Sequence, residues 1–295
     1  MSHILKNQNL EIYIDLPEEN YTGTRFDLSG LIRKVVFEGV AFGALEELES
    51  DQQDQLGCGF YNEFGIDSPL GFEETEKGEW FHKMGVGMLK KDGDEYSFAH
   101  KYEIQPCDFG VQKDAESILF EHSSKLLNGF GYRLKKKIIL VREGFRINYF
   151  LENTGNKKIQ TSEYCHNFLA IGNQPIGEDY VLKFLFDLNS NNFKENVNPE
   201  NCVQFKNFEV RFLSTPEEAF FFSHLNGYQT VRPIWNLENM RLNFGVQETT
   251  DFETSKINLW GCKHVVSPEL FFDISLNVAE SVSWSRYYRF YKSTE

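Results

Sequence analysis

Hydrophobic and polar residues alternate along most of the chain, and a repeat of two residues is the pattern of a half-buried β-strand. Short strands separated by turn residues at this spacing predict an all-β fold, a large antiparallel β-sandwich. No internal repeat, coiled coil or linker interrupts the pattern, so we expect residues 1–295 to form a single domain. The clearest alternating stretches are residues 10–14, 32–37, 95–102, 132–141, 145–151, 180–185, 208–213, 220–225, 257–263, 267–276 and 282–291.

Three segments depart from simple alternation. Residues 21–30 predict a strand that is punctuated by glycines and carries Arg25. The acidic residues 45–55 have no apolar repeat, which predicts a solvated loop or a short helix. Residues 214–218, Ser-Thr-Pro-Glu-Glu, have the chemistry of the first turn of a helix.

Two further segments, residues 57–65 and 78–87, combine glycines with large aromatic side chains and predict loops. Because large aromatic rings are seldom fully solvated, such loops either fold over the core or line a hollow. The second segment also carries His82 and Lys83.

The most informative strand covers residues 162–169, Ser-Glu-Tyr-Cys-His-Asn-Phe-Leu. Alternation along a strand places Tyr164, His166 and Phe168 on one face and the residues between them on the other. A histidine flanked by aromatic rings is either a packed core residue or a proton donor at the floor of an aromatic-lined cleft. Because imidazole titrates near neutral pH, the second role needs little adjustment of its pKa.

A late strand, residues 267–276, carries one carboxylate of interest. Its apolar side chains recur at every second position from Leu270 onward, which leaves Glu269 on the less apolar face. The pattern therefore predicts Glu269 at the start of this strand, with its side chain outside the apolar core.

The formal net charge of −14 disfavours nucleic acid, anionic lipid and polyphosphate as partners, because the long-range field repels them. A content of 41% hydrophobic and 15% aromatic residues is enough for a sizeable core. Aromatic rings on a concave sheet face also suit a sugar, since the apolar face of a pyranose packs on them.

The cysteines are odd in number and scattered, at Cys58, Cys107, Cys165, Cys202 and Cys262. No two have the spacing of metal ligands, which disfavours both a disulfide framework and a zinc site. The first residues lack the apolar core of a signal peptide, and no apolar run is long enough to span a membrane. We therefore expect no metal, no membrane partner and a cytoplasmic location.

Five short motifs follow one another along the chain: Thr-Arg-Phe-Asp at 24–27, Trp-Phe-His-Lys at 80–83, Glu-Tyr-Cys-His-Asn-Phe at 163–168, Ser-Pro-Glu at 267–269 and Trp-Ser-Arg-Tyr-Tyr-Arg-Phe at 284–290. In this order they resemble the galactose mutarotase-like superfamily, which includes the aldose 1-epimerases. The resemblance spans nearly the whole chain and implies a β-supersandwich, two stacked antiparallel sheets with a concave carbohydrate site.

The resemblance implies that His166 is the general acid and Glu269 the general base. Arg25 and His82 match positions at which the family presents basic groups to sugar hydroxyls. The aspartate that members use to hold those hydroxyls has no direct counterpart here, and the substitutes we consider are Asn236 and Glu238.

Four more residues complete the expected substrate contacts: Lys83, Asn167, Trp260 and Lys263. Each candidate also has a structural alternative. A histidine or tryptophan can pack in the core, an arginine can pair with a carboxylate, and a surface lysine can simply be solvated.

Interconversion of anomers needs one group to take the proton of the C1 hydroxyl and another to protonate the ring oxygen, with no metal and no cofactor. An isomerase of the aldose 1-epimerase type, acting on a free aldose, is therefore the first hypothesis. A non-catalytic carbohydrate-binding protein is the second, because a fold alone does not settle its function. A different reaction on the same scaffold is the third, since sugar-processing lyases and hydrolases carry related sandwiches. Those enzymes normally have extra helical domains, and the pattern of this sequence predicts none.

A phosphosugar mutarotase is a further alternative, and it would need Arg or Lys clustered at the mouth of the cleft. In every case we expect a small-molecule sugar as the partner. Either a monomer or a homodimer is compatible with the sequence.

Overall fold

The computed structural model describes residues 2–17 and 19–293, so residues 1, 18 and 294–295 of the predicted domain lie outside the description. Within these ranges the chain has no α-helix, only the 3-10 turns η1 (Gln53–Gln55) and η2 (Ser190–Asn192). The predicted all-β class is therefore confirmed. No helix in the described ranges has the length and apolarity that a membrane span requires.

The first large sheet carries the candidate site residues near its middle. β4 (Val40–Phe42) pairs with β3 beside the main path. The strands follow the order β1 (His3–Lys6), β2 (Leu10–Asp15), β3 (Leu31–Phe37), β5 (Phe60–Phe64), β13 (Ile159–Asn167), β22 (Val265–Leu276), β21 (Ile257–Cys262), β18 (Phe220–Ser223) and β15 (Glu195–Val197).

The second large sheet is built around the long strands of the middle and the end of the chain. A small third sheet contains β6 (Trp80–Lys83), β7 (Gly87–Lys90) and β8 (Ile104–Pro106). The order in the second sheet is β16 (Val203–Lys206), β17 (Glu209–Phe212), β14 (Tyr180–Phe184), β19 (Ile234–Asn239), β20 (Phe244–Thr250), β23 (Ser281–Lys292), β12 (Gly144–Asn153), β11 (Tyr132–Val141), β10 (Ser117–Ser123) and β9 (Gly110–Lys113).

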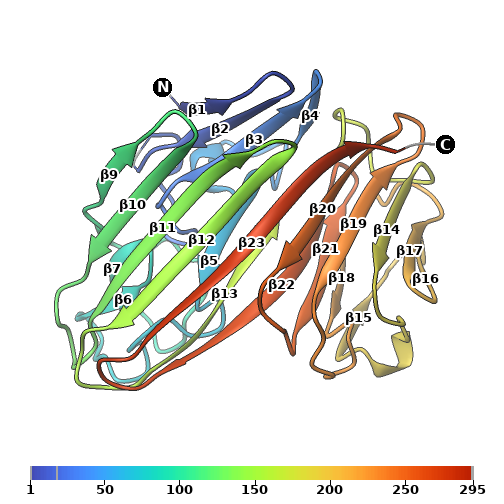
Figure 1. Ribbon diagram of the computed structural model, residues 1–295. Coiled ribbons are helices and arrows are strands. Elements are labelled where there is room, and N and C mark those ends of the chain that lie inside the picture. Colours follow the sequence, from blue (N-terminus) through green and yellow to red (C-terminus); the bar gives the residue numbers. More distant parts are fainter. Residues whose placement is uncertain (1, 18, 294–295) are drawn as a thin grey trace.

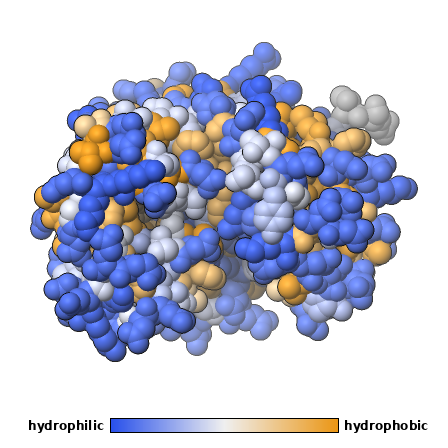
Figure 2. Space-filling model, turned by 90° about the horizontal axis from the view of Figure 1, so that it is seen from below, coloured by the Kyte–Doolittle hydropathy of each residue, from blue (hydrophilic) through white to orange (hydrophobic). Residues whose placement is uncertain are grey.

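The two large sheets pack face to face, with β11, β12 and β23 in front of β5 and β13 in Figure 1. Aromatic side chains fill the space between them. The Phe60 ring of the first sheet lies 5.4 Å from that of Phe145 and 5.0 Å from that of Tyr288, both in the second. Burial of each such side chain contributes about 1.5–3 kcal/mol. The side of the molecule seen in Figure 2, from below in the view of Figure 1, is mainly hydrophilic with separate hydrophobic patches.

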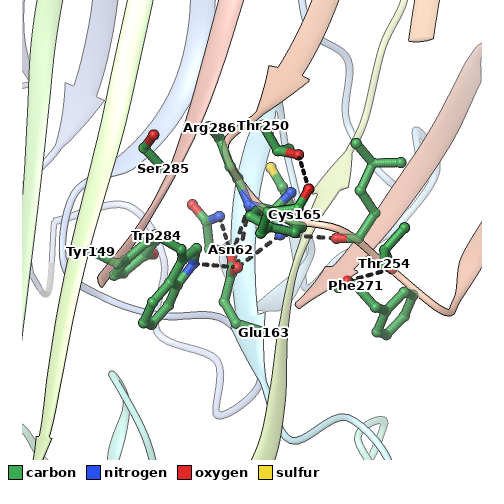
Figure 3. A network of polar contacts seen from close by, with 12 residues as sticks. Asn62, Tyr149, Glu163, Cys165, Thr250, Thr254, Phe271, Trp284, Ser285 and Arg286 are labelled. Atoms are coloured by element: carbon green, nitrogen blue, oxygen red, sulfur yellow. Dashed lines mark hydrogen bonds and ion pairs between the residues drawn. The ribbon is translucent and has the colours of Figure 1, made fainter. Parts of the chain in front are cut away.

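A charged group also lies between the sheets. Figure 3 shows Arg286, Trp284 and Asn62 directed at the Glu163 carboxylate. Arg286 Nη2 lies 2.7 Å from Glu163, and Arg286 Nη1 lies 2.8 Å from Glu248. The Trp284 indole and the Asn62 amide donate to Glu163 over 2.9 and 2.8 Å. Buried charges are tolerated only with such complete pairing.

Three of the predicted elements are wrong, and side-chain hydrogen bonds explain two of them. Residues 21–30 form no strand, because the backbone amides of Arg25 and Phe26 donate to the Tyr21 hydroxyl rather than to a neighbouring strand. Residues 214–218 form no helix, because the backbone amides at 217 and 218 donate to the carboxylate of Glu200.

The third error is the predicted strand over residues 95–102, which is irregular. Its alternating aromatic residues serve a local cluster, in which the rings of Tyr96 and Tyr102 stack at 5.7 Å beside Phe81. Conversely, the two segments predicted as loops contain β5, β6 and the start of β7.

Candidate active site

His166 on β13 and Glu269 on β22 meet at the floor of a cavity of about 520 Å³. His166 Nε2 lies 3.3 Å from Glu269 Oε1. Only 4% of each residue is exposed, so both are accessible mainly through this cavity. Glu269 lies inside β22 rather than at the start of a strand, which corrects the predicted strand boundary.

The imidazole is held on three sides. Its Nδ1 lies 2.9 Å from the Ser267 hydroxyl. The ring stacks on Phe168 with centroids 3.8 Å apart and meets Trp260 edge-on at 5.3 Å. Tyr164 and Phe168 flank His166 on the same side of β13, as the alternation predicted. The ring plane is therefore fixed before any ligand enters.

Arg25 brings a positive charge to one wall of the cavity. Its guanidinium donates to Glu63 over 2.9 Å, to Glu46 over 2.9 Å and to the Tyr164 hydroxyl over 3.1 Å. Lys83 Nζ lies behind this group, 2.9 Å from the other Glu63 oxygen. With these partners the guanidinium is held in place, although its segment has no regular secondary structure.

Burial shifts the pKa values of the two central groups in opposite directions. Burial is the main reason that the pKa of Glu269 rises to about 8, against the opposing effects of Arg25 and a hydrogen bond from Asn258. Burial, with a smaller effect of Arg25, lowers the pKa of His166 well below its usual value. Near pH 7 the pair therefore carries one proton, on the carboxyl group, beside a neutral imidazole.

The remaining walls come from the strands next to β22. Trp260 on β21 and Phe271 on β22 supply aromatic surface, and the Lys256 ammonium lies 4.2 Å above the Phe271 ring. His224 and Lys194 stand at the far side, near β18 and β15. Burial and the charges of Lys256 and Lys194 lower the pKa of His224. This side of the cavity therefore holds three basic groups, together with the carboxylates of Glu195 and of Asp67, which lies 3.5 Å from Lys256.

Four of the predicted substrate contacts do not line this cavity. His82 is buried, with Nε2 3.3 Å from the Phe130 carbonyl oxygen, and Lys83 is paired with Glu63. Asn167 faces the space between the sheets, because it is one residue away from His166 on an alternating strand. Lys263 is exposed and paired with Glu217. These positions correct the expectation of direct contact.

The two substitutes for the family's aspartate also lie elsewhere. Glu238 on β19 pairs with Lys183 over 2.8 Å, and Asn236 accepts from Gln247 over 2.7 Å. Both belong to the second sheet, whereas the cavity is lined from the first. Of the predicted site residues, the structure brings together His166, Glu269, Arg25 and Trp260.

Sequence reasoning missed several lining residues. Glu46 belongs to the acidic segment that we expected to be solvated, yet its carboxylate also accepts from the Gly57 amide over 2.7 Å. Asn258 stands opposite Glu269 in the register of β21 and β22, so that pairing was the signal that could have revealed it. Lys194 and Lys256 carried no local motif that could have singled them out.

Two other hollows, of about 550 and 650 Å³, are larger. The first has His264 but no carboxylate among its described lining residues, and the second has Glu209 but no histidine. Neither joins a proton donor to a proton acceptor as the smaller cavity does.

No protein-family model matches the chain, and no curated protein matches it in sequence. Solved structures do match it. The galactose mutarotase related enzyme from Lactobacillus acidophilus aligns with a TM-score of 0.62 at 10% identity, over 100% of this chain and 99% of that one. A galactose mutarotase-like protein from Clostridium acetobutylicum has a TM-score of 0.59 at 12% identity, over 98% and 94% of the two chains.

An aldose epimerase homologue from C. elegans aligns over 100% of both chains, with a TM-score of 0.51 at 12% identity. At such identities the likeness shows a shared fold and no more. The predicted galactose mutarotase-like architecture, with antiparallel sheets, is thereby confirmed.

Proposed function

We propose that this protein is an isomerase of the aldose 1-epimerase type, which interconverts the α and β anomers of an aldose. The observation that carries the proposal is the contact of 3.3 Å between His166 and Glu269 at the floor of an open cavity. A proton donor and a proton acceptor in one place are what the opening of a hemiacetal requires. The shared fold is consistent with this chemistry.

The reaction conserves the number of protons on the pair. One group takes the proton from O1 while the C1–O5 bond breaks, its electrons pass to O5, and the other group protonates O5. Rotation about C1–C2 and reversal of these steps close the ring in the other configuration. The raised pKa of Glu269 and the lowered pKa of His166 put the proton on Glu269, so Glu269 protonates O5 and His166 takes the O1 proton. This order is the reverse of the roles that the resemblance implied.

The contact between the two groups also changes the expected placement of the sugar. We expected them on opposite sides of C1, but the pyranose cannot lie between groups that touch. O1 and O5 are bonded to the same carbon, so two adjacent groups can reach both oxygens from one side. The aromatic rings of Trp260 and Phe271 offer surface for the apolar face of the ring.

Polarimetry with freshly dissolved α- and β-aldoses tests the proposal. The protein is expected to speed the approach to the equilibrium optical rotation of at least one hexose or pentose, in proportion to its concentration. Binding of a sugar with no change in that rate would contradict the proposal and would favour the carbohydrate-binding alternative.

The pH dependence follows from the single proton on the pair. Because the pKa of Glu269 is about 8, that proton is lost above this pH. The pKa of His166 lies well below 6.5, so a second proton binds only in more acidic solution. We expect kcat/KM to be flat near pH 7 and to fall about tenfold per pH unit above pH 8. A kcat/KM that rises as the pH passes 8 would contradict the assignment of Glu269 as the proton donor.

A second candidate substrate is an aldose that carries an anionic substituent such as a 6-phosphate. Lys194, Lys256 and His224 gather on one side of the cavity. Lys256 is paired with Asp67 over 3.5 Å, whereas Lys194 has no ion pair among the described residues. This basic side is the feature that a phosphosugar mutarotase would need at the mouth of its cleft. The overall charge of −14 does not exclude such a local site.

Lys194→Gln tests the anionic substrate directly. Because a hydrogen bond to a charged group contributes about 1.5–3 kcal/mol, KM for a 6-phosphate is expected to rise about tenfold or more. KM for the free aldose should stay the same. Lys77→Gln, at an exposed lysine outside the cavity lining, is the matched control. If KM for the 6-phosphate is the same in Lys194→Gln as in wild type, the free aldose is favoured as the substrate.

A further inference from the structure

The strands β13 and β22 are not paired where His166 and Glu269 stand. Their antiparallel pairing stops at Tyr164 and Phe271. It resumes at the bridge between Leu169 and Val266, where both backbone amides donate over 3.0 Å. Between these two pairings each strand has the same number of residues. His166 on β13 and Glu269 on β22 therefore lie opposite each other within the unpaired stretch.

A proline explains the gap. Hydrogen-bonded residue pairs alternate along an antiparallel ladder. Since Leu169 and Val266 are such a pair, the next one is Asn167 with Pro268. Pro268 has no backbone N–H and cannot donate to β13. On its other edge β22 stays paired with β21 through this stretch, with Asn258 opposite Glu269. Only toward β13, the strand that carries His166, does the backbone ladder leave β22 unfixed beside the reactive carboxyl group.

Two buried side chains contact the β22 backbone in the stretch that is not paired with β13. The Asn167 amide donates to the Pro268 carbonyl over 2.7 Å. Arg286 Nη2 donates to the Leu270 carbonyl over 2.9 Å. These two carbonyl groups flank Glu269 in the chain, so both sides of its backbone are held from behind the sheet.

The Asn167 side chain is itself fixed. Its amide also donates to Glu248 over 3.2 Å, and its carbonyl oxygen accepts from the Tyr288 hydroxyl over 3.0 Å. Glu248 in turn accepts from Arg286 over 2.8 Å. Asn167, Glu248 and Arg286 are all fully buried. With these partners the Asn167 side chain is held in one orientation, and its hydrogen bond to the Pro268 carbonyl fixes β22 relative to β13.

We propose that Asn167 is a positioning residue, which holds β22 across the proline gap so that Glu269 meets His166. Its effect on catalysis rests on the proposed function. The residue was expected to contact the sugar, but it acts from the opposite face of the strand. A misplacement of about 1 Å in a catalytic group can cost about 10²-fold in rate.

The test compares Asn167→Ala with Asn153→Ala. Asn153 is also buried and its amide donates to three backbone carbonyls, one of them that of Leu276 at the far end of β22. We expect kcat for mutarotation to fall about 10–100-fold in Asn167→Ala with little change in KM. Asn153→Ala should lose comparable stability and keep its kcat. Equal kcat values in the two variants would overturn the proposal.

A spectroscopic measurement keeps the two proposals separate. The ¹⁵N signals of the His166 ring, assigned with His166→Gln, report its contact with Glu269 whether or not the protein turns over sugar. They should move in Asn167→Ala and stay in place in Asn153→Ala. If wild type fails to accelerate mutarotation while these signals move as expected, the proposed function fails and the positioning role stands. Unmoved His166 signals in Asn167→Ala would refute the positioning role.

Discussion

Glu269→Gln and His166→Gln are each expected to lower kcat for mutarotation by about 10²–10⁴-fold, the usual contribution of one general acid or base. Glutamine can hydrogen-bond but cannot exchange a proton at these pH values. Removal of either partner therefore stops the transfer between O1 and O5. Polarimetry of each purified variant measures the effect.

His264→Gln is the matched control, because His264 lines a different hollow and bonds to the Leu45 carbonyl. It should retain the wild-type rate. A wild-type rate in Glu269→Gln as well would remove Glu269 from the mechanism.

Loss of stability cannot account for the expected result with Glu269→Gln. The pKa of Glu269 is about 8 in the folded protein, above the ordinary value of 4.5. Between these values the folded state keeps a proton that the unfolded state releases, so wild-type stability falls as pH rises. Glutamine removes this penalty. We expect Glu269→Gln to melt at a higher temperature than wild type at pH 8, and the difference should shrink toward pH 4.5.

Arg286→Leu is expected to destabilise the protein by about 3–5 kcal/mol, the cost of breaking a buried ion pair from one side. Arg286 is the shared partner of Glu163 and Glu248, and all three are fully buried. Without the guanidinium, two carboxylates must ionise in the interior or bind protons there. Denaturant unfolding at pH 7 gives the change in the free energy of unfolding.

Arg289→Leu is the control on the same strand, since Arg289 is exposed and paired with Glu143. Exposed pairs contribute about 0.2–1 kcal/mol, so this variant should unfold almost as wild type does. Equal losses in the two variants would show that the buried network is not a main source of stability.

The strand pattern was readable because alternation reports local burial directly. Residues 132–141 and 10–14 coincide with β11 and nearly with β2. Two of the three segments that were predicted wrongly, residues 21–30 and 214–218, are those in which side chains replace the backbone as hydrogen-bond partners. The Tyr21 hydroxyl accepts hydrogen bonds from the backbone amides of Arg25 and Phe26, and no local sequence pattern predicts these bonds.

For the candidate site, the sequence predicted that His166 and Glu269 lie together, but it did not predict most of the other residues that line the cavity. Alternation predicted correctly that His166 and its aromatic neighbours share a face. The same rule, applied one residue further, places Asn167 on the opposite face, but we still expected it to touch the sugar. Lys194 and Lys256 reach the cavity because β21, β18 and β15 follow β22 side by side in the first sheet. The order of strands in a sheet cannot be read from local sequence.

The most direct test of the account is exchange NMR of the anomeric protons of an aldose at equilibrium. Wild-type protein should raise the α-to-β exchange rate in proportion to its concentration, while the same amount of Glu269→Gln should leave the uncatalysed rate. An exchange rate that wild type does not change, across free and 6-phosphorylated aldoses, would contradict the claim that His166 and Glu269 open the sugar ring.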